Sequence, residues 1–170
     1  VVVILDTFTV EDLKEYRNII SRMPESDKAC GFVSGSAEIS HWPKHDLFTF
    51  YYDTKPLYGR LNDFMQPPDT ADAYAAAKAG AANLYHQLCH TFLHGGGSSM
   101  EILKDSYKHT FFILQALYFV RHHTYIQTRR ELSNLLPQTE KEILDTYLYW
   151  PESVKLGETH LFQTLISWCS

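Results

Sequence analysis

The stretch after Pro67-Pro68 constrains the fold most, because every later segment has a helical pattern. Asp69 or Thr70 can cap a long helix that ends near His94, since either side chain can accept a hydrogen bond from the first turn. Its alanine-rich faces suit close packing against another helix. A second long helix is expected over residues 100–122, from the apolar spacing.

The connections between the expected helices are short. Residues 95–99 (GGGSS) are typical of a flexible connector between the two long helices. Thr128 and Thr139 each have a Glu three residues later, a capping-box pattern that predicts a third and a fourth helix. Pro151 is expected to end the fourth helix, and a last helix is expected over residues 157–168. Five helices with short connections predict an antiparallel helical bundle.

The first residues have a different pattern. Residues 1–5 (VVVIL) followed by Asp6 predict a buried strand that ends in a carboxylate. Thr9 with Asp12 three residues later predicts the start of a helix, which Pro24 closes. The expected order of strand, turn and helix is that of an α/β element.

Residues 24–68 contain many Gly and Pro residues and look irregular. Residues 48–52 fit either a short strand or a helical turn, and residues 57–58 fit another short strand. The opening strand needs sheet neighbours, and little later in the chain looks strand-like, so either the sheet is very small or the rest of it is not in this sequence. We therefore expect residues 1–68 to be the end of an α/β domain plus a connector, and residues 69–170 to be the bundle domain. The predicted fold class is mainly α, with a small α/β remnant.

Composition excludes some classes of function. The formal net charge of -5 argues against broad binding of nucleic-acid backbones, which requires clustered Lys and Arg. The cysteines, Cys30, Cys89 and Cys169, are far apart and form no C-x-x-C pair, which fits a reducing compartment. The apolar run over residues 111–120 is far shorter than a membrane span. We expect a cytoplasmic protein that does not bind a membrane.

His86, His90 and His94 follow each other at intervals of four residues. This spacing puts three side chains on one face of a helix, and two histidines so placed can share a zinc ion. Gln87 stands where the H-E-x-x-H motif has its Glu. The spacing also fits a mixed polar face that binds no metal. Both interpretations remain open from the sequence.

Several longer stretches resemble the helical C-terminal domain of bacterial nucleotidyltransferases of the aminoglycoside and MNT type. The resemblance lies in residues 107–119 (YKHTFFILQALYF), Tyr125 and residues 129–132 (RREL). Upstream stretches are similar to the segment that joins the catalytic domain to those helices: residues 30–35 (CGFVSG), 46–48 (DLF) and 52–59 (YDTKPLYG). The similarity covers most of the chain and consists of packing patterns rather than catalytic signatures.

The resemblance implies a particular chemistry. In that family a Gly-Ser pair and an Asp-x-Asp pair lie on a small mixed sheet, a third acid comes from a later strand, and Mg²⁺ holds the nucleotide phosphates. The reaction transfers a nucleoside monophosphate from an NTP to an acceptor hydroxyl. This sequence has Gly35-Ser36 but no Asp-x-Asp after it, and Asp6 matches the third acid. Asp6 is therefore the expected catalytic and metal-binding residue, and this chain alone is expected not to transfer nucleotides.

The resemblance also implies that the helical bundle takes part in substrate binding. In such proteins the bundle shapes the acceptor side of the cleft and often forms a homodimer interface. Tyr85, His86, His90 and Lys108 are the expected substrate-binding residues, placed on facing helices. Tyr and His side chains can bind a small polar acceptor, and Lys108 can meet a phosphate. The leading interpretation is the C-terminal part of a nucleotidyltransferase-like protein.

Two other classes of function compete with this interpretation. The chain fits a non-catalytic helical interaction module, HEPN-like or antitoxin-like, whose Tyr and Phe side chains cover a protein partner. The RNA-cleaving activity of HEPN domains needs a His about four to six residues after an Arg, and Arg121 has none at that distance. A metal-binding bundle built on the three spaced histidines is the other alternative.

Overall fold

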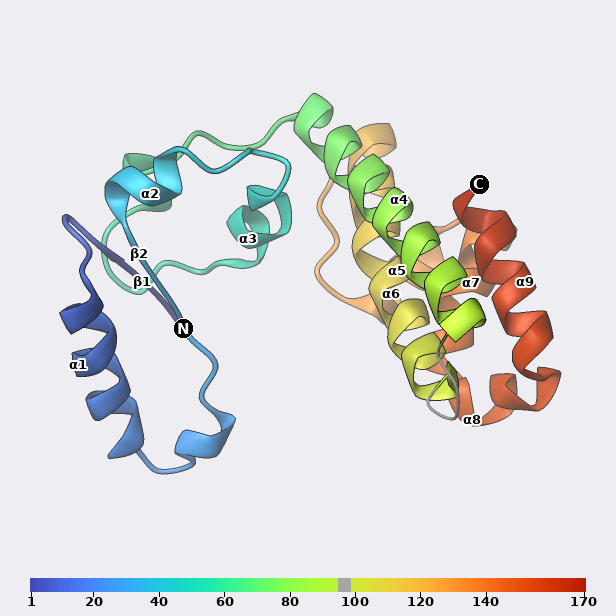
Figure 1. Ribbon diagram of the computed structural model, residues 1–170. Helices are drawn as coiled ribbons and strands as arrows, with labels where there is room; N and C mark the ends of the chain where they lie inside the picture. Colours follow the sequence, from blue (N-terminus) through green and yellow to red (C-terminus); the bar gives the residue numbers. More distant parts are fainter. Residues whose placement is uncertain (95–98) are drawn as a thin grey trace. The chain divides into compact units, whose positions relative to one another are not determined.

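In a computed structural model that describes residues 1–94 and 99–170, the chain divides into two compact units, Val1–Pro67 and Pro68–Ser170. Most described residues are helical, and the strands form a two-stranded parallel sheet in the first unit (Figure 1). The division falls at the Pro67-Pro68 pair. Of the expected Gly- and Ser-rich connector, residues 95–98 lie outside the described residues.

The sheet of the first unit joins two strands across a helix. Strand β1 (Val2–Leu5) pairs in parallel with β2 (Phe32–Gly35), and helix α1 (Val10–Ser21) connects them. The predicted opening strand is confirmed, although its residues are half-buried rather than buried. Strand β2 lies within residues 24–68, where short strands were expected only at residues 48–52 or 57–58, and the sheet is very small, one of the two expected possibilities.

A capping box fixes the start of α1. The Thr9 hydroxyl accepts a hydrogen bond from the Asp12 N–H (3.4 Å), and the Asp12 carboxylate accepts one from the Thr9 N–H (2.7 Å). Both predicted ends of this helix are confirmed, since it ends at Ser21 ahead of Pro24. The hydrogen bonds from the Thr9 side chain and backbone hold the pKa of Asp12 below its ordinary value.

The rest of the first unit is short helices and turns. Its elements are η1 (Ser26–Lys28), α2 (Ser36–Ser40), α3 (Leu47–Asp53) and η2 (Leu61–Asp63). A small core of Ile39, Leu47 and Met65 holds α2, α3 and the η2 segment together. Residues 48–52 are thus helical, one of the two expected forms. Residues 57–58 form no strand: Leu57 and Tyr58 are 94% and 99% exposed, in a bend with nothing to pair with.

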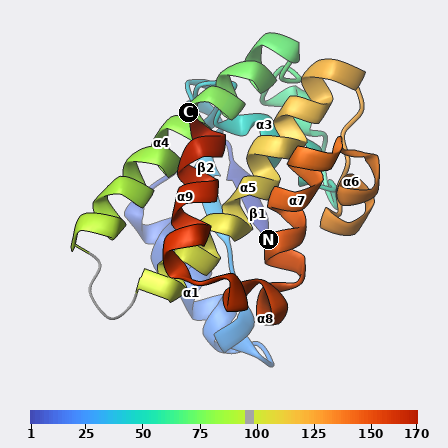
Figure 2. The ribbon, with the colours of Figure 1, turned by 90° about the vertical axis from the view of Figure 1, so that its right-hand side faces the viewer.

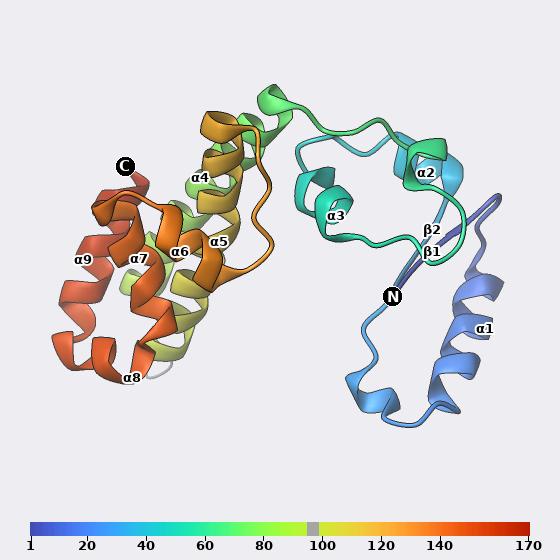
Figure 3. The ribbon, with the colours of Figure 1, turned by 180° about the vertical axis from the view of Figure 1, so that it is seen from behind.

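The second unit contains all five predicted helices. Its elements are α4 (Thr70–His94), α5 (Ser99–His122), α6 (Arg129–Leu135), α7 (Gln138–Leu148), α8 (Trp150–Ser153), η4 (Val154–Leu156) and α9 (Glu158–Cys169). Helix α5 packs against α4, α7 and α9, and α9 also lies along α4 (Figure 2). Helix α6 packs on α7, on the side seen in Figure 3. No helix among the described residues has the length and apolar character needed to cross a membrane.

The long helices approach closely where side chains are small. A Cβ atom at Gly80 of α4 would lie 2.9 Å from Cγ1 of Ile113 on α5, closer than side-chain atoms normally come. Helix α5 has more buried residues than any other helix, and Leu103, Tyr107 and Leu114 are fully buried. The Tyr107 hydroxyl donates a hydrogen bond to the Leu161 carbonyl (2.9 Å) and so ties α5 to α9.

The caps of the second unit follow the predictions in part. Asp69 caps α4, since its carboxylate accepts hydrogen bonds from the N–H groups of Ala71 and Asp72. Thr128 accepts one from the Glu131 N–H (3.3 Å), so the predicted start of α6 is confirmed.

Two predictions at α7 were wrong. Thr139 does not cap this helix, which begins at Gln138 directly after Pro137. Pro137 has no N–H and a fixed φ that favours a helix start, so Thr139 already lies inside the first turn. Pro151 does not end α7 either: α7 ends at Leu148, and Pro151 lies in the first turn of α8, where its missing N–H breaks no helical bond.

The capping box predicts a pH response of the first unit. The pKa of Asp12 is lower in the folded protein than in the unfolded chain. The ionised Asp12 carboxylate therefore stabilises the fold fully above the ordinary pKa of Asp, and this stabilisation is lost as the pH falls through the lower pKa of the folded protein. Thr9→Val removes the side-chain hydrogen bonds, so the Asp12 pKa should rise toward its ordinary value. NMR titration of the carboxyl carbon measures it. Identical titration curves for the two proteins would contradict the proposed cause.

The Gly80 contact predicts intolerance of larger side chains. Gly80→Val should lower the free energy of unfolding by about 2 kcal/mol, because the new methyl groups force Ile113 out of its place. Valine is a better helix former than glycine, so propensity alone predicts the opposite sign. Urea unfolding measures the change. Ala82→Val, at an exposed position of α4, is the control and should lose only about 0.5 kcal/mol. Equal losses would show that no close contact limits position 80.

Candidate functional site

The carboxyl ends of the two strands bring together residues from distant parts of the sequence. Leu5 pairs with Gly35 at the end of the parallel ladder, so Asp6 and Ser36 both follow the same edge. The Ser36 hydroxyl donates a hydrogen bond to the Asp6 main-chain carbonyl (3.1 Å). The edge therefore holds an exposed carboxylate beside a Gly-Ser pair that starts a helix.

A second carboxylate lies at this edge. A Cβ atom at Gly35 would lie 2.0 Å from Oε2 of Glu38 and 3.0 Å from Cβ of Phe8. The bare backbone of Gly35 thus leaves room for the Glu38 side chain, which folds back over the start of α2. Glu38 was not among the site residues predicted from the sequence. Its place in the first turn after a Gly-Ser pair was the signal available.

The strand-end edge fits only part of a magnesium site. Mg²⁺ is usually bound through one or two carboxylates together with water and substrate phosphates. Asp6 and Glu38 are ligands of that chemistry. Across residues 1–94 and 99–170, however, no group of three or more His, Cys, Asp or Glu side chains could hold a metal ion. Any ion at this edge needs further ligands from outside the described residues, and we derive no reaction step through it.

The four expected substrate-binding residues lie on the surface of the second unit. Tyr85, His86 and His90 are exposed on α4, and Lys108 is exposed on α5. His86 and His90 are neighbours on one face, with ring centroids 6.4 Å apart. None of the four lines the cleft described below. Their role in substrate binding stays a prediction.

The histidine row continues to His94, whose ring centroid lies 5.0 Å from that of His90. All three rings are exposed, and they follow one another along the helix face rather than surrounding a common point. At most two neighbouring histidines, His86 with His90 or His90 with His94, can therefore bind the same metal ion. A closed structural zinc site has four ligands.

A cleft of about 640 Å³ lies between α7, the α8–η4 segment and α9. Its size falls in the range of small-molecule sites. The side chains that matter for its chemistry include acids, aromatic rings and an imidazole: Tyr107, Glu142, Asp145, Tyr149, His160 and Trp168. This cleft was not predicted from the sequence, because its residues come from several helices, and the one motif among them, Thr139 with Glu142, was interpreted as a helix cap.

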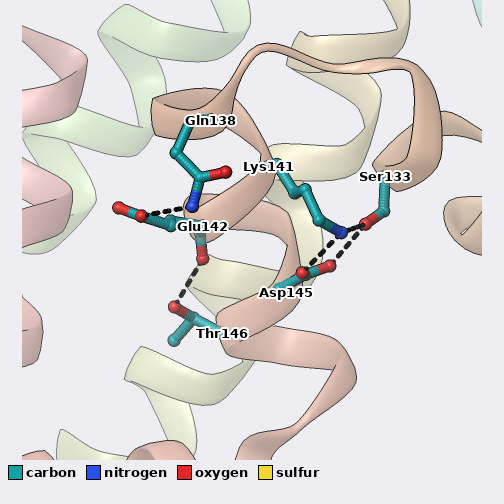
Figure 4. A network of polar contacts seen from close by, with 6 residues as sticks. All are labelled: Ser133, Gln138, Lys141, Glu142, Asp145 and Thr146. Atoms are coloured by element: carbon teal, nitrogen blue, oxygen red, sulfur yellow. Dashed lines mark hydrogen bonds and ion pairs between the residues drawn. The ribbon is translucent and has the colours of Figure 1, made fainter.

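Ion pairing distinguishes the two acids of the cleft (Figure 4). The Lys141 ammonium lies 2.8 Å from Oδ2 of Asp145 and donates a hydrogen bond to the Ser133 hydroxyl, which in turn donates to Oδ1 of Asp145. Asp145 is therefore neutralised. Glu142, one turn earlier, accepts a hydrogen bond from the uncharged amide of Gln138 (2.7 Å) and forms no ion pair with any described residue.

The inner wall of the cleft is not suited to acid–base chemistry. Burial, and to a lesser extent the nearby Cys169, raise the pKa of Tyr107 well above its ordinary range. Cys169 lies next to the lining residue Trp168 without lining the cleft itself, and burial raises the pKa of its thiol to about 11. Both groups stay protonated at neutral pH, so the phenol acts as a hydrogen-bond donor to Leu161 and the thiol is a poor nucleophile.

Comparison with protein-family models, with curated proteins and with solved structures finds no match to this chain. The residues and their geometry are therefore the basis for any functional assignment.

The exposed, spread-out histidine rings predict that zinc does not stabilise the second unit. Zinc should leave the thermal unfolding midpoint of the protein unchanged. His90→Ala should alter the free energy of unfolding by less than about 0.5 kcal/mol, as an exposed substitution usually does. Calorimetry with and without zinc measures both, with the exposed Gln87→Ala as control. A saturable zinc stabilisation that His90→Ala abolishes and Gln87→Ala preserves would instead establish a metal site.

Proposed function

We propose that this chain is part of a nucleotidyltransferase-like protein, which transfers a nucleoside monophosphate from an NTP to the hydroxyl of a small polar acceptor. The observation that carries the proposal is the hydrogen bond between Ser36 and the Asp6 carbonyl at the strand-end edge. Open α/β sheets bind their ligands outside the carboxyl ends of the strands, and helix starts favour phosphates. A carboxylate beside a Gly-Ser helix start is an arrangement suited to a metal–nucleotide complex.

The proposal gives the residues of this edge separate roles. Asp6 would hold Mg²⁺ as one of its carboxylate ligands, and the backbone at Gly35-Ser36 would lie against the phosphates. Bound Mg²⁺ would neutralise charge on the transferred phosphoryl group. The sequence contains no Asp-x-Asp pair. This chain alone is therefore expected to bind an NTP weakly and not to transfer its nucleotide.

The second unit would form the acceptor side of such a protein. In this proposal its helices are an antiparallel bundle, and Tyr85, His86, His90 and Lys108 are its substrate-binding residues. The exposure of all four side chains supports their availability to a ligand. The bundle would also form a homodimer interface, and the protein would work in the cytoplasm without a membrane partner.

Exposed apolar side chains near the end of α4 favour one alternative, a non-catalytic helical interaction module. Phe92 and Leu93 are 55% and 72% exposed, although each could bury substantial apolar area against a partner. In this alternative the second unit binds another protein through these side chains, and the strand-end edge has no nucleotide to bind.

Nucleotide titration followed by NMR tests the proposed function. A non-hydrolysable ATP analogue with Mg²⁺ should shift the amide signals of Gly35 and Ser36, and the shift should depend on Mg²⁺. Asp6→Asn should weaken that binding about tenfold, the loss expected for one good charged ligand. Asp27→Asn, at an exposed acid of η1, is the matched control and should change nothing.

Two outcomes would count against the nucleotidyltransferase proposal. The first is the absence of any magnesium-dependent shift at the strand-end edge, which would leave the interaction module as the better explanation. The second is an equal loss for the Asp6 and Asp27 variants, which would show only a general charge effect.

A further inference from the structure

We propose that the cleft between α7, the α8–η4 segment and α9 binds a small organic cation, a protonated amine carried on an apolar body. The cleft lies wholly within the second unit. The proposal goes beyond nucleotide transfer and stands or falls independently of it. Charge, hydrogen-bonding polarity and the apolar walls of the cleft each point to this class of ligand.

The charge of the cleft favours a cation. None of the side chains that line it, all in the described part of the chain, is Lys or Arg, and His160 is its one basic group. Lys141 neutralises Asp145, whereas Glu142 has no cationic partner within ion-pair distance among the described residues. One uncompensated carboxylate thus remains at the rim, and an anionic ligand would meet repulsion there.

Three of the lining hydroxyl groups favour a ligand that donates hydrogen bonds, whereas the Ser167 hydroxyl already accepts a hydrogen bond from Gln163 and keeps its proton. Thr146 donates its proton to the Glu142 carbonyl (2.8 Å), Ser153 donates to the Tyr149 carbonyl (3.0 Å), and Tyr107 donates to Leu161. Each oxygen has used its only proton within the protein and keeps lone pairs for accepting. An ammonium group supplies three donors and no acceptor, so it complements such a surface.

The walls supply apolar and aromatic contacts. Ile143 and Leu161 are buried beneath the cleft, while Tyr149 and Leu156, at 60% and 58% exposed, leave apolar surface uncovered. Trp168 is half-buried on the same lining. Aromatic faces attract an ammonium ion and also cover an apolar body. A molecule with both features gains more in this cleft than a fully hydrated inorganic cation.

Three probes with one body and different charges test the proposal on the full chain. Phenethylamine, phenethyl alcohol and phenylacetate are titrated by calorimetry, with NMR to place binding at α7 and α9. Phenethylamine should bind roughly fivefold more tightly than the alcohol, the gain expected for an exposed ion pair. Phenylacetate should bind more weakly than the alcohol.

Matched variants separate the Glu142 carboxylate from the general charge of the protein. Glu142→Gln should reduce phenethylamine affinity to that of the alcohol, and Glu142→Asp should restore part of the preference. Glu152→Gln removes an exposed acid on the neighbouring α8 that does not line the cleft, so it should leave the amine preference intact. Thermal unfolding of each variant confirms that it is folded.

The proposal is overturned by any of three results. The first is that phenethylamine binds no more tightly than phenethyl alcohol. The second is that none of the probes binds at α7 and α9. The third is that the Glu142 and Glu152 variants lose phenethylamine affinity equally. Nucleotide binding at the strand-end edge affects none of these outcomes, so failure here is distinguishable from failure of the proposed nucleotidyltransferase function.

Discussion

The burial of α5 is the constraint on which the second unit depends. This helix packs against α4, α7 and α9, and its side chains fill the space among them. Two buried donors within it have fixed partners: the Gln115 side-chain NH2 donates to the Ile126 carbonyl (2.6 Å), and the Tyr107 hydroxyl donates to the Leu161 carbonyl. Because unpaired buried polar groups are costly, these bonds fix the loop after α5 and the position of α9, and with it one wall of the cleft.

The first unit depends on a different constraint, the parallel pairing of two four-residue strands. Pairing brings Asp6 and Ser36 to one edge, whereas in the sequence they are far apart. So small a sheet supplies little stability by itself. The core of Ile39, Leu47 and Met65 under α2 and α3 stabilises this unit alongside it. The two units therefore position their candidate sites by different means: a helical core in one and strand register in the other.

The sequence predicted what depends on residues within one helical turn. Thr9 and Thr128 were recognised as caps because their partners stand three residues away. Thr139 has the same pattern and fails, because Pro137 starts the helix earlier. Strand β2 was missed because Ser34 and Gly35 are weak strand formers and its partner lies in a distant segment. The family resemblance named Asp6 and Gly35-Ser36 together, but their place at one sheet edge became visible only from the strand pairing. The cleft was unpredictable because its walls meet only after the helices pack.

Helix α1 contributes no fully buried side chain, although it carries the whole connection between the two strands. It is held at its start by Thr9 and Asp12, and by Tyr16, whose ring covers the backbone of Gly31. So little burial gives this helix a low free energy of local opening compared with the core helices. Its amides should therefore exchange with solvent through partial unfolding events that leave the second unit intact. When α1 opens locally, the register of the two strands is no longer fixed. The hydrogen bond between Ser36 and the Asp6 carbonyl should then be lost as well.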